Sequence, residues 1–464
     1  MSKHLKLLLA FAALALMVAA PAMAAKFEFH GDLNNRFLVY TDQINFFSSN
    51  SSSTALDEKD APDSFASIKY RMWMEAATDD GKIKGVYAIE LGAIRFGTTG
   101  VGRHQGGSWS GDGANIETRW AYTDFQLPSV DSKARFRIGL QTHAVNPLFW
   151  AETAMGVKFY TDNWYLAWMR PVETQTVGGD SWGDGDFNAL TARYDLKMEP
   201  VKAGIFVNYF WQDVNLSGGS FTDLSGFEPF VSYSVDSLPS ANFSMIAIGL
   251  DGDWSTATSF GKVFAAWDLI YENGSLDDVS VDGVTKTNLD LSAYMLHADL
   301  GVSFGKATVT YSIYYGSGDD NPDDNDLDAY MIVDTDASYS IIFNEGGYTD
   351  DDYFSDKYTI ADKGIFSHKL ALDYAATKKT KVGVAVLYLS TSEDVELING
   401  KKESELGLEF DAYVSHKLYD NLKVELNFGY LAAGDVLDVF EGTKEDGKSD
   451  IDLWRSTARV RYSF

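Results

Sequence analysis

The chain has 464 residues and a formal net charge of −29, with 67 acidic residues against 38 Lys and Arg. It contains no cysteine, which excludes a disulfide framework and any thiolate metal site. The acidic balance argues against nucleic-acid binding, which needs a basic stripe or patch. Aromatic residues make up 14% of the chain, and 40 Gly against only 9 Pro favour long strands joined by tight turns.

The first 24 residues predict a secretory signal. Lys3 and Lys6 precede an apolar run over residues 7–20, and Ala22-Met23-Ala24 matches a small-residue cleavage site. We therefore expect residues 1–24 to be removed and residues 25–464 to form one domain. No later run is long and apolar enough for a membrane helix. A membrane location would therefore require a closed β-barrel, because every backbone polar group in lipid must be paired.

Period-two alternation predicts about eighteen antiparallel strands. The segments are residues 26–40, 65–78, 82–96, 116–127, 133–141, 154–160, 164–172, 187–197, 201–212, 242–253, 259–271, 288–304, 306–316, 366–377, 381–389, 404–418, 422–431 and 451–464. The pair 154–160 and 164–172 is the weakest, so sixteen strands is the alternative. Residues 227–235 are a further candidate for an extra strand or a short helix.

The connections between these strands alternate in length. Every second one is a short turn, such as Asp79-Asp80-Gly81 or Asp420-Asn421, and most of the others are longer and polar, such as residues 317–365 and 390–403. Short turns on one rim and long loops on the other are typical of a transmembrane antiparallel β-barrel with short periplasmic turns and long extracellular loops. We predict this all-β fold.

The last strand shows which face meets which environment. Trp454, Val460 and Tyr462 alternate with arginines, and the chain ends on Phe464. A charge facing lipid at mid-depth would cost roughly 2–4 kcal/mol. The charged faces of the strands are therefore predicted to face the lumen.

The signal, the alternating loop lengths, the acidic loops and the terminal Arg461-Tyr462-Ser463-Phe464 together resemble the bacterial outer-membrane porins. More narrowly, the chain resembles the outer membrane homotrimeric porin family of sulfate-reducing bacteria. The resemblance implies a homotrimer of water-filled barrels, embedded in outer-membrane lipids and lipopolysaccharide of the bacterial cell, that passes small hydrophilic solutes and ions by diffusion.

A set of basic residues is predicted to line the channel on its luminal wall. The set is Lys69, Arg71, Arg119, Arg135, Arg137, Arg193, Arg455, Arg459 and Arg461. One interpretation is a basic ladder that favours anions. The other is that these side chains pair with luminal acids and fill the wall. The acids are Glu75, Glu117, Asp124, Asp195, Glu409 and Asp411. The sequence leaves both interpretations open.

Porins of this kind fold the loop after the fifth strand into the pore. Here that segment is residues 142–153, which is short and lacks the usual acidic, Gly-rich pattern. His143 and Glu152 are the candidate constriction residues, and the loop of residues 97–115 is the alternative.

The loop of residues 317–365 carries a dense carboxylate run. Carboxylate oxygens suit Ca²⁺, so Asp319, Asp320, Asp323 and Asp324 are candidate ligands. The EF-hand order of ligands is absent, and a solvated acidic loop is the competing interpretation. No other cofactor is expected.

Catalysis is not predicted. The seven histidines lie singly, without metal-ligand spacing, and no G-x-S-x-G motif occurs. The favoured function is a general diffusion porin with a preference for anions. The alternative is a substrate-specific outer-membrane channel, for example for oligosaccharides, with an aromatic track supplied by Trp73, Phe206, Phe210 and Tyr294.

Overall fold

The computed structural model describes residues 25–40, 63–100, 105–109, 113–128, 133–172, 186–212, 227–228, 242–277, 280–281, 284–285, 288–321, 324–335, 339–343, 362–440, 446–449 and 452–464. The predicted signal lies outside these residues. No helix in the described part of the chain is long and apolar enough to span a membrane.

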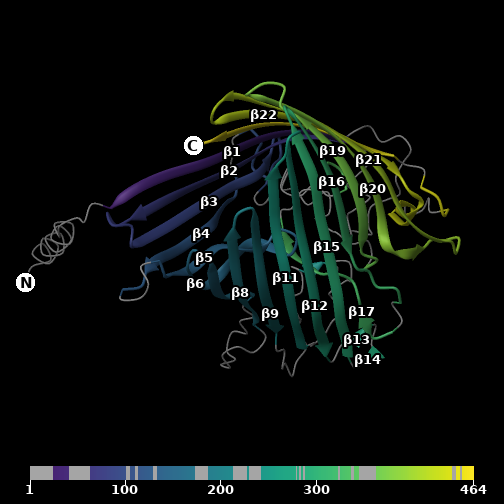
Figure 1. Cartoon of the computed structure of the whole chain (residues 1–464), viewed down its shortest axis with the longest axis horizontal. Helices are drawn as coiled ribbons and strands as arrows, with labels where there is room; N and C mark the ends of the chain where they lie inside the picture. The colour runs from purple at the N-terminus through teal and green to yellow at the C-terminus, as the bar shows by residue number, and fades with distance from the viewer. Residues whose placement is uncertain are drawn as a thin grey trace, which may run out of the picture.

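Eighteen long strands form one closed antiparallel barrel (Figure 1). They are β1 (Lys26–Tyr40), β2 (Asp63–Ala77), β3 (Ile83–Arg95), β4 (Ile116–Gln126), β5 (Arg135–Asn146), β6 (Trp150–Tyr160), β7 (Trp164–Val172), β8 (Phe187–Met198), β9 (Val201–Gln212), β11 (Asn242–Ala257), β12 (Lys262–Asp277), β15 (Asn288–Phe304), β16 (Ala307–Gly316), β19 (Ile365–Tyr374), β20 (Thr380–Glu396), β21 (Lys402–Tyr419), β22 (Leu422–Ala433) and β23 (Leu453–Ser463). Each pairs with the next, and β23 pairs with β1. The prediction of an eighteen-strand barrel is confirmed, and the sixteen-strand alternative is wrong because β6 and β7 both belong to the wall.

Several short elements are not part of the barrel wall. They are β10 (Phe227–Glu228), β13 (Ser280–Val281), β14 (Val284–Thr285), β17 (Asp326–Leu327), β18 (Ile332–Thr335) and the 3₁₀ helix η2 (Asp435–Phe440). Among the described residues β10 pairs with β18 and not with a wall strand, and residues 229–235 of the candidate extra strand lie outside them. β18 pairs in parallel with β6, which places the connection between β16 and β19 beside the inner end of the β5–β6 hairpin.

Two predicted connections are shorter than expected. β5 continues to Asn146 and β6 begins at Trp150, which leaves a short turn between them. β20 and β21 extend across most of the predicted loop of residues 390–403. The extended β20–β21 hairpin buries Val395 and Leu397, and Val436 and Leu437 of η2 are buried in the same apolar cluster. Beyond the lipid a strand needs no apolar outer face, so the period-two pattern that marks the membrane part fades there.

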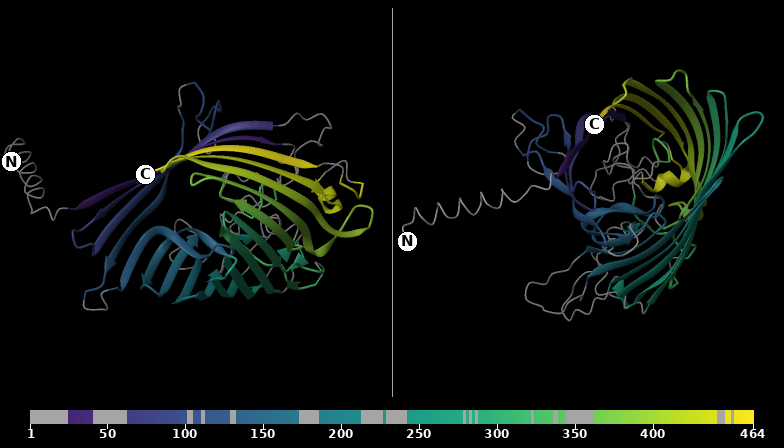
Figure 2. Two further views of the ribbon diagram at one scale, coloured as in Figure 1. Left: turned by 45° about the horizontal axis from the view of Figure 1, so that its top comes forward. Right: turned by 60° about the vertical axis from the view of Figure 1, so that its left-hand side comes forward.

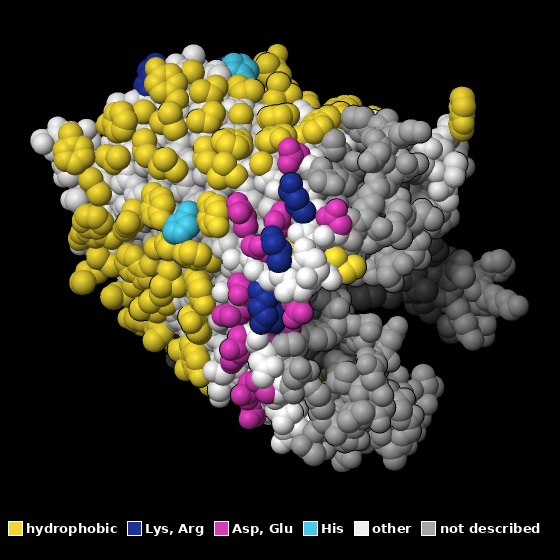
Figure 3. All heavy atoms as spheres, turned by 90° about the vertical axis from the view of Figure 1, so that its right-hand side faces the viewer, with side chains coloured by type: hydrophobic (Ala, Val, Ile, Leu, Met, Phe, Trp, Pro, Cys, Tyr) yellow, Lys and Arg dark blue, Asp and Glu magenta, His cyan; other side chains and the backbone are white. Residues whose placement is uncertain are grey.

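The outer and inner faces of the wall follow the predicted alternation. Outward Leu370, Val384 and Leu426 are each more than half exposed, while luminal Leu387 and Leu389 are buried. Figure 3 shows hydrophobic side chains covering the wall, with Asp, Glu, Lys and Arg gathered in a separate zone beside it. The outer face is therefore the one that meets lipid.

The seam between the first and last strands is closed by polar and backbone contacts. Phe464 exchanges two backbone hydrogen bonds of 3.0 Å with Gly31, and Arg461 forms an ion pair with Asp32. Figure 2 shows the wall curving round so that β1 and β23 lie side by side. Closure leaves no free sheet edge, as a barrel in lipid requires.

Replacing outward Leu370 with Arg should destabilise the folded barrel by about 2–4 kcal/mol, because the charge would face the lipid. Thr310→Arg on the neighbouring strand β16 is the matched control, since Thr310 lies on the luminal face between Gly301 and Ala371. Urea unfolding of the refolded protein in vesicles measures both. Equal destabilisation by the two variants would contradict the assignment of faces.

Candidate functional site

Three strands place their luminal cations around one carboxylate. The carboxylate of Glu90 on β3 forms ion pairs with Lys69 and Arg71 of β2, at N···O distances of 3.1 and 2.6 Å. It also pairs with Arg119 of β4 at 2.9 Å. The side chain of Glu90 is only 7% exposed. Glu90 therefore accepts from three bases, and Arg119 also lies 3.7 Å from Glu152; we call this set the Glu90 cluster.

A second cluster lies next along the wall around Asp124 on β4, whose side chain is 1% exposed. Arg135 and Arg137 of β5 reach its two oxygens at 2.6 and 2.9 Å, and the hydroxyl of Tyr160 donates to it at 2.6 Å. The Arg137 guanidinium also lies 4.5 Å above the ring of Tyr122. In this Asp124 cluster two arginines share one acid.

Lys158 extends the basic surface from the Asp124 cluster onto β6. It lies opposite Arg137 in the strand register, and its amine is 3.8 Å from the centre of the Tyr165 ring. Contact with a ring face stabilises a cation without cancelling its charge.

A cavity of about 480 Å³ opens beside the Asp124 cluster at the short-turn end of the barrel. Arg135, Asp124 and Tyr160 line one side, and the luminal pair Glu75 and Lys84 lines another. Arg135 also donates to the carbonyl oxygens of Gly81 and Lys82, at 3.3 and 3.4 Å, which ties the β2–β3 turn to the cluster.

The remaining predicted channel-lining residues have other surroundings. Arg459 pairs with Glu425 at 2.6 Å, and Arg461 pairs with Asp32. Arg193 forms a bidentate pair with Asp251 at 2.6 and 2.7 Å and also contacts Asp195. Arg193, Arg459 and Arg461 therefore form ion pairs with luminal acids, as in the second of the two interpretations of the basic residues.

Arg455 does not line the open channel as predicted. Its side chain faces inward but is fully buried, and it donates to the carbonyl oxygen of Ile341 at 3.4 Å. The chain segment that covers Arg455 separates it from open space in the lumen. Sequence reasoning missed Arg36, which is also fully buried on a luminal position and lies opposite Arg459 in the register.

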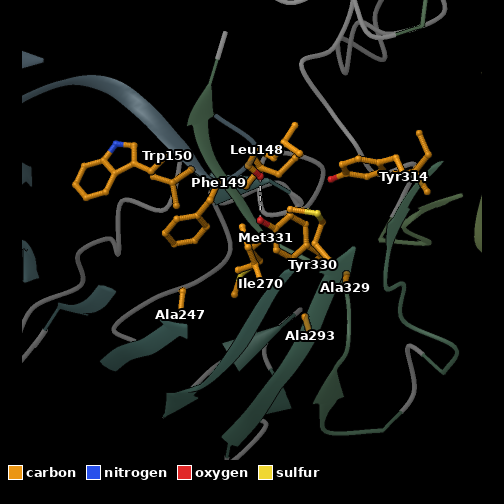
Figure 4. Packing of buried hydrophobic residues seen from close by; sticks show 14 of the residues in the cluster. Leu148, Phe149, Trp150, Ala247, Ile270, Ala293, Tyr314, Ala329, Tyr330 and Met331 are labelled. Carbon is orange, nitrogen blue, oxygen red and sulfur yellow. Dashed lines mark hydrogen bonds between the residues drawn. The ribbon is translucent and has the colours of Figure 1, made fainter. Parts of the chain in front are cut away.

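The lumen is narrowed by two segments. The tip of the β5–β6 hairpin, Leu148 with Phe149 and Trp150, packs onto the luminal Phe206 and Phe210 of β9. Residues 329–333 of the β16–β19 connection lie against it, and Figure 4 shows the Tyr330 hydroxyl donating to the Leu148 carbonyl, at 2.9 Å. A large hydrophobic cluster thus fills part of the interior.

The expected constriction segment of residues 142–153 does lie inside the barrel, as extended strand and a tight tip. His143 is fully buried, with its Nε2 3.1 Å from the Thr191 hydroxyl, so it faces no open space. Glu152 lies 3.7 Å from Arg119. In the alternative loop, residues 97–115, Trp109 is fully exposed.

The acidic loop does not assemble a metal site in the part that the structure describes. Asp319 accepts the Asn321 backbone N–H, and Asp324 accepts the Asn321 side chain and the Asp326 N–H. No group of three carboxylates or histidines in the described ranges is arranged to hold a metal ion. Asp323 lies outside the described residues.

The predicted aromatic track is dispersed. Trp73 is luminal and stacks on His30, with 5.1 Å between the ring centres. Phe206 and Phe210 are buried under the hairpin tip. Tyr294 is 52% exposed on the outer wall, so its assignment to the lumen is wrong. Because β15 is apolar on both faces near Tyr294, the alternation of residues did not show which face is luminal.

No family model and no curated protein matches the sequence. Solved structures match it over nearly its whole length. OpdK of Pseudomonas aeruginosa, in a structure with vanillate, has a TM-score of 0.51 at 10% identity and covers 94% of this chain and 98% of its own. A BenF-like porin from Pseudomonas fluorescens has a TM-score of 0.52 at 11% identity and covers 95% and 98%. Pseudomonas aeruginosa OccK2 (OpdF), in complex with glucuronate, has a TM-score of 0.50 at 12% identity and covers 95% and 96%.

At these identities the likeness is one of fold, and the fold is that of an outer-membrane porin. The narrower resemblance to the homotrimeric porins of sulfate-reducing bacteria stays a prediction.

Replacing Glu90 with Gln should increase the preference of a conducting barrel for anions, because three cations would lose their shared acid. In a salt gradient, the reversal potential in a planar bilayer should move toward the anion equilibrium potential. Glu199→Gln removes the same charge from an exposed turn outside the lumen. An equal shift in both variants would contradict a local effect.

Proposed function

We propose that this protein is a channel of the bacterial outer membrane that selects small carboxylate-bearing solutes. The observation that carries the proposal is the excess of bases around Asp124 on the inner wall. Arg135 and Arg137 share the single carboxylate of Asp124. Lys158 lies opposite Arg137 in the register, with its amine against the Tyr165 ring. Arginine recognises planar carboxylates through paired hydrogen bonds, and rings of basic residues in a pore favour anions.

A selective channel fits the interior better than a general diffusion pore. A broad aqueous lumen needs an inner wall that is open to water, whereas here the hairpin tip and the β16–β19 connection bury a hydrophobic cluster inside the barrel. Solutes would therefore pass along the remaining wall, where the cations lie. The solved structures of OpdK with vanillate and of OccK2 with glucuronate support the same class, because both ligands are carboxylate anions.

The same geometry favours carboxylates over neutral oligosaccharides. A sugar track needs several aromatic rings in line along the lumen, and only Trp73 of the four predicted rings is luminal without being covered. Assembly as a homotrimer among outer-membrane lipids and lipopolysaccharide remains part of the proposal and rests on the family resemblance.

Arg137→Gln should weaken binding of a test carboxylate by about tenfold or more, because a hydrogen bond to a charged group contributes about 1.5–3 kcal/mol. Arg135 would still pair with Asp124 and limit damage to the fold. Current interruptions by glucuronate in a planar bilayer measure the affinity, and glucose is the neutral comparison. The variant Lys202→Ala, at an exposed pair with Asp253, is the control. Wild-type interruptions that do not distinguish glucuronate from glucose would contradict the proposed selectivity.

A further inference from the structure

The connection between β16 and β19 enters the barrel and is held there by luminal carboxylates. Glu409 of β21 accepts the backbone N–H groups of Ile341, Ile342 and Phe343 at 3.0, 2.7 and 3.2 Å. Glu272 of β12 accepts the N–H of Met331 at 2.9 Å. Both glutamates are fully buried. Two carboxylates on separate strands thus bind two parts of the same connection.

Glu409 binds a run of three successive amides with both of its oxygens. Successive backbone N–H groups that converge in this way form an anion-binding concavity. Hydrogen bonds to a charged acceptor are stronger than neutral ones. A glutamine of the same shape has one oxygen and one NH₂ group, so it would direct a donor at an amide that is itself a donor.

Two cations bind the carbonyl groups of the same stretch. Lys369 of β19 donates to the Tyr339 oxygen at 2.5 Å, and Arg455 of β23 donates to the Ile341 oxygen at 3.4 Å. In the Glu90 and Asp124 clusters, by contrast, acids and bases bind one another. The charges of this part of the wall are directed at the backbone of the connection.

The segment near Glu272 adds apolar packing to its single anchor. Ala329, Tyr330, Met331 and Ile332 are buried, and luminal Leu291, Ala293 and Met295 are buried in the same cluster. The N–H of Val333 also donates to the carbonyl of Phe149 at 2.7 Å. The hairpin tip and the connection therefore stay in place together (Figure 4).

We propose that Glu272 and Glu409 are positioning residues that set the width of the channel by holding the β16–β19 connection across the lumen. The inference rests on the proposed channel function but concerns the size limit for solutes, whereas the basic clusters govern the preference for charge. Neither glutamate needs to contact a passing solute.

The test compares Glu409→Gln, Glu272→Met and wild-type protein by single-channel recording and by the uptake of neutral sugars of increasing size into vesicles. Methionine is used at position 272 because a glutamine carbonyl could still accept the N–H of Met331. The fraction of time in wide openings should rise at least about tenfold in each variant, which corresponds to about 1.4 kcal/mol of lost anchoring. Larger sugars should then enter. The reversal potential should change less than in Glu90→Gln, because the anchors lie in a different part of the wall from the basic clusters.

Glu425→Gln is the matched control, because Glu425 is a luminal carboxylate that pairs with Arg459 rather than with the connection. Heat-dependent migration in gels establishes that each variant is folded, and Glu272→Met decides the test where Glu409→Gln does not fold. Folded anchor variants with the conductance and size limit of wild type would overturn the inference. A wild-type barrel without conductance would instead contradict the proposed function.

Discussion

The pairing of every backbone polar group in lipid is the constraint on which the rest of this structure depends. It requires a closed sheet, and closure divides each strand into a lipid face and a luminal face. Once outward residues such as Leu370 and Val384 are committed to lipid, all charges on the strands must lie inside. The crowding of Arg, Lys, Asp and Glu in the lumen follows from this division before any function is considered.

Inside the barrel the charges are used in two different ways. On β2 to β5 they form mixed clusters in which the buried acids Glu90 and Asp124 each accept from more than one base. On β12, β19, β21 and β23 they bind the backbone of an inserted segment. A buried charge must be paired or hydrogen-bonded to be tolerated, and the two halves of the wall meet that requirement by different partners.

The sequence predicted the wall well because the wall obeys a period of two. The segment of residues 26–40 coincides with β1, and Ile205, Val207 and Tyr209 alternate along β9 to form its apolar outward face. The luminal Arg135 and Arg137 were found by the same rule. Their shared partner Asp124 was one of several predicted acids, and the register that joins it to Arg137 is a tertiary property.

The interior segments obey no such period, and the sequence could not place them. Glu409 was taken for a partner of arginines, because alternation shows that a side chain points inward but not what fills the space it enters. The three amides that bind it come from residues 341–343, which lie 66 to 68 positions away in the chain. The acidic run that drew attention in the same loop forms local turn contacts, whereas the unremarkable residues 329–333 make the buried contacts. A barrel of this size has room for water across its whole section. Its selectivity therefore depends on the segments that enter it, and the side chains that hold those segments are as important for the width as the charged clusters are for the choice of ion.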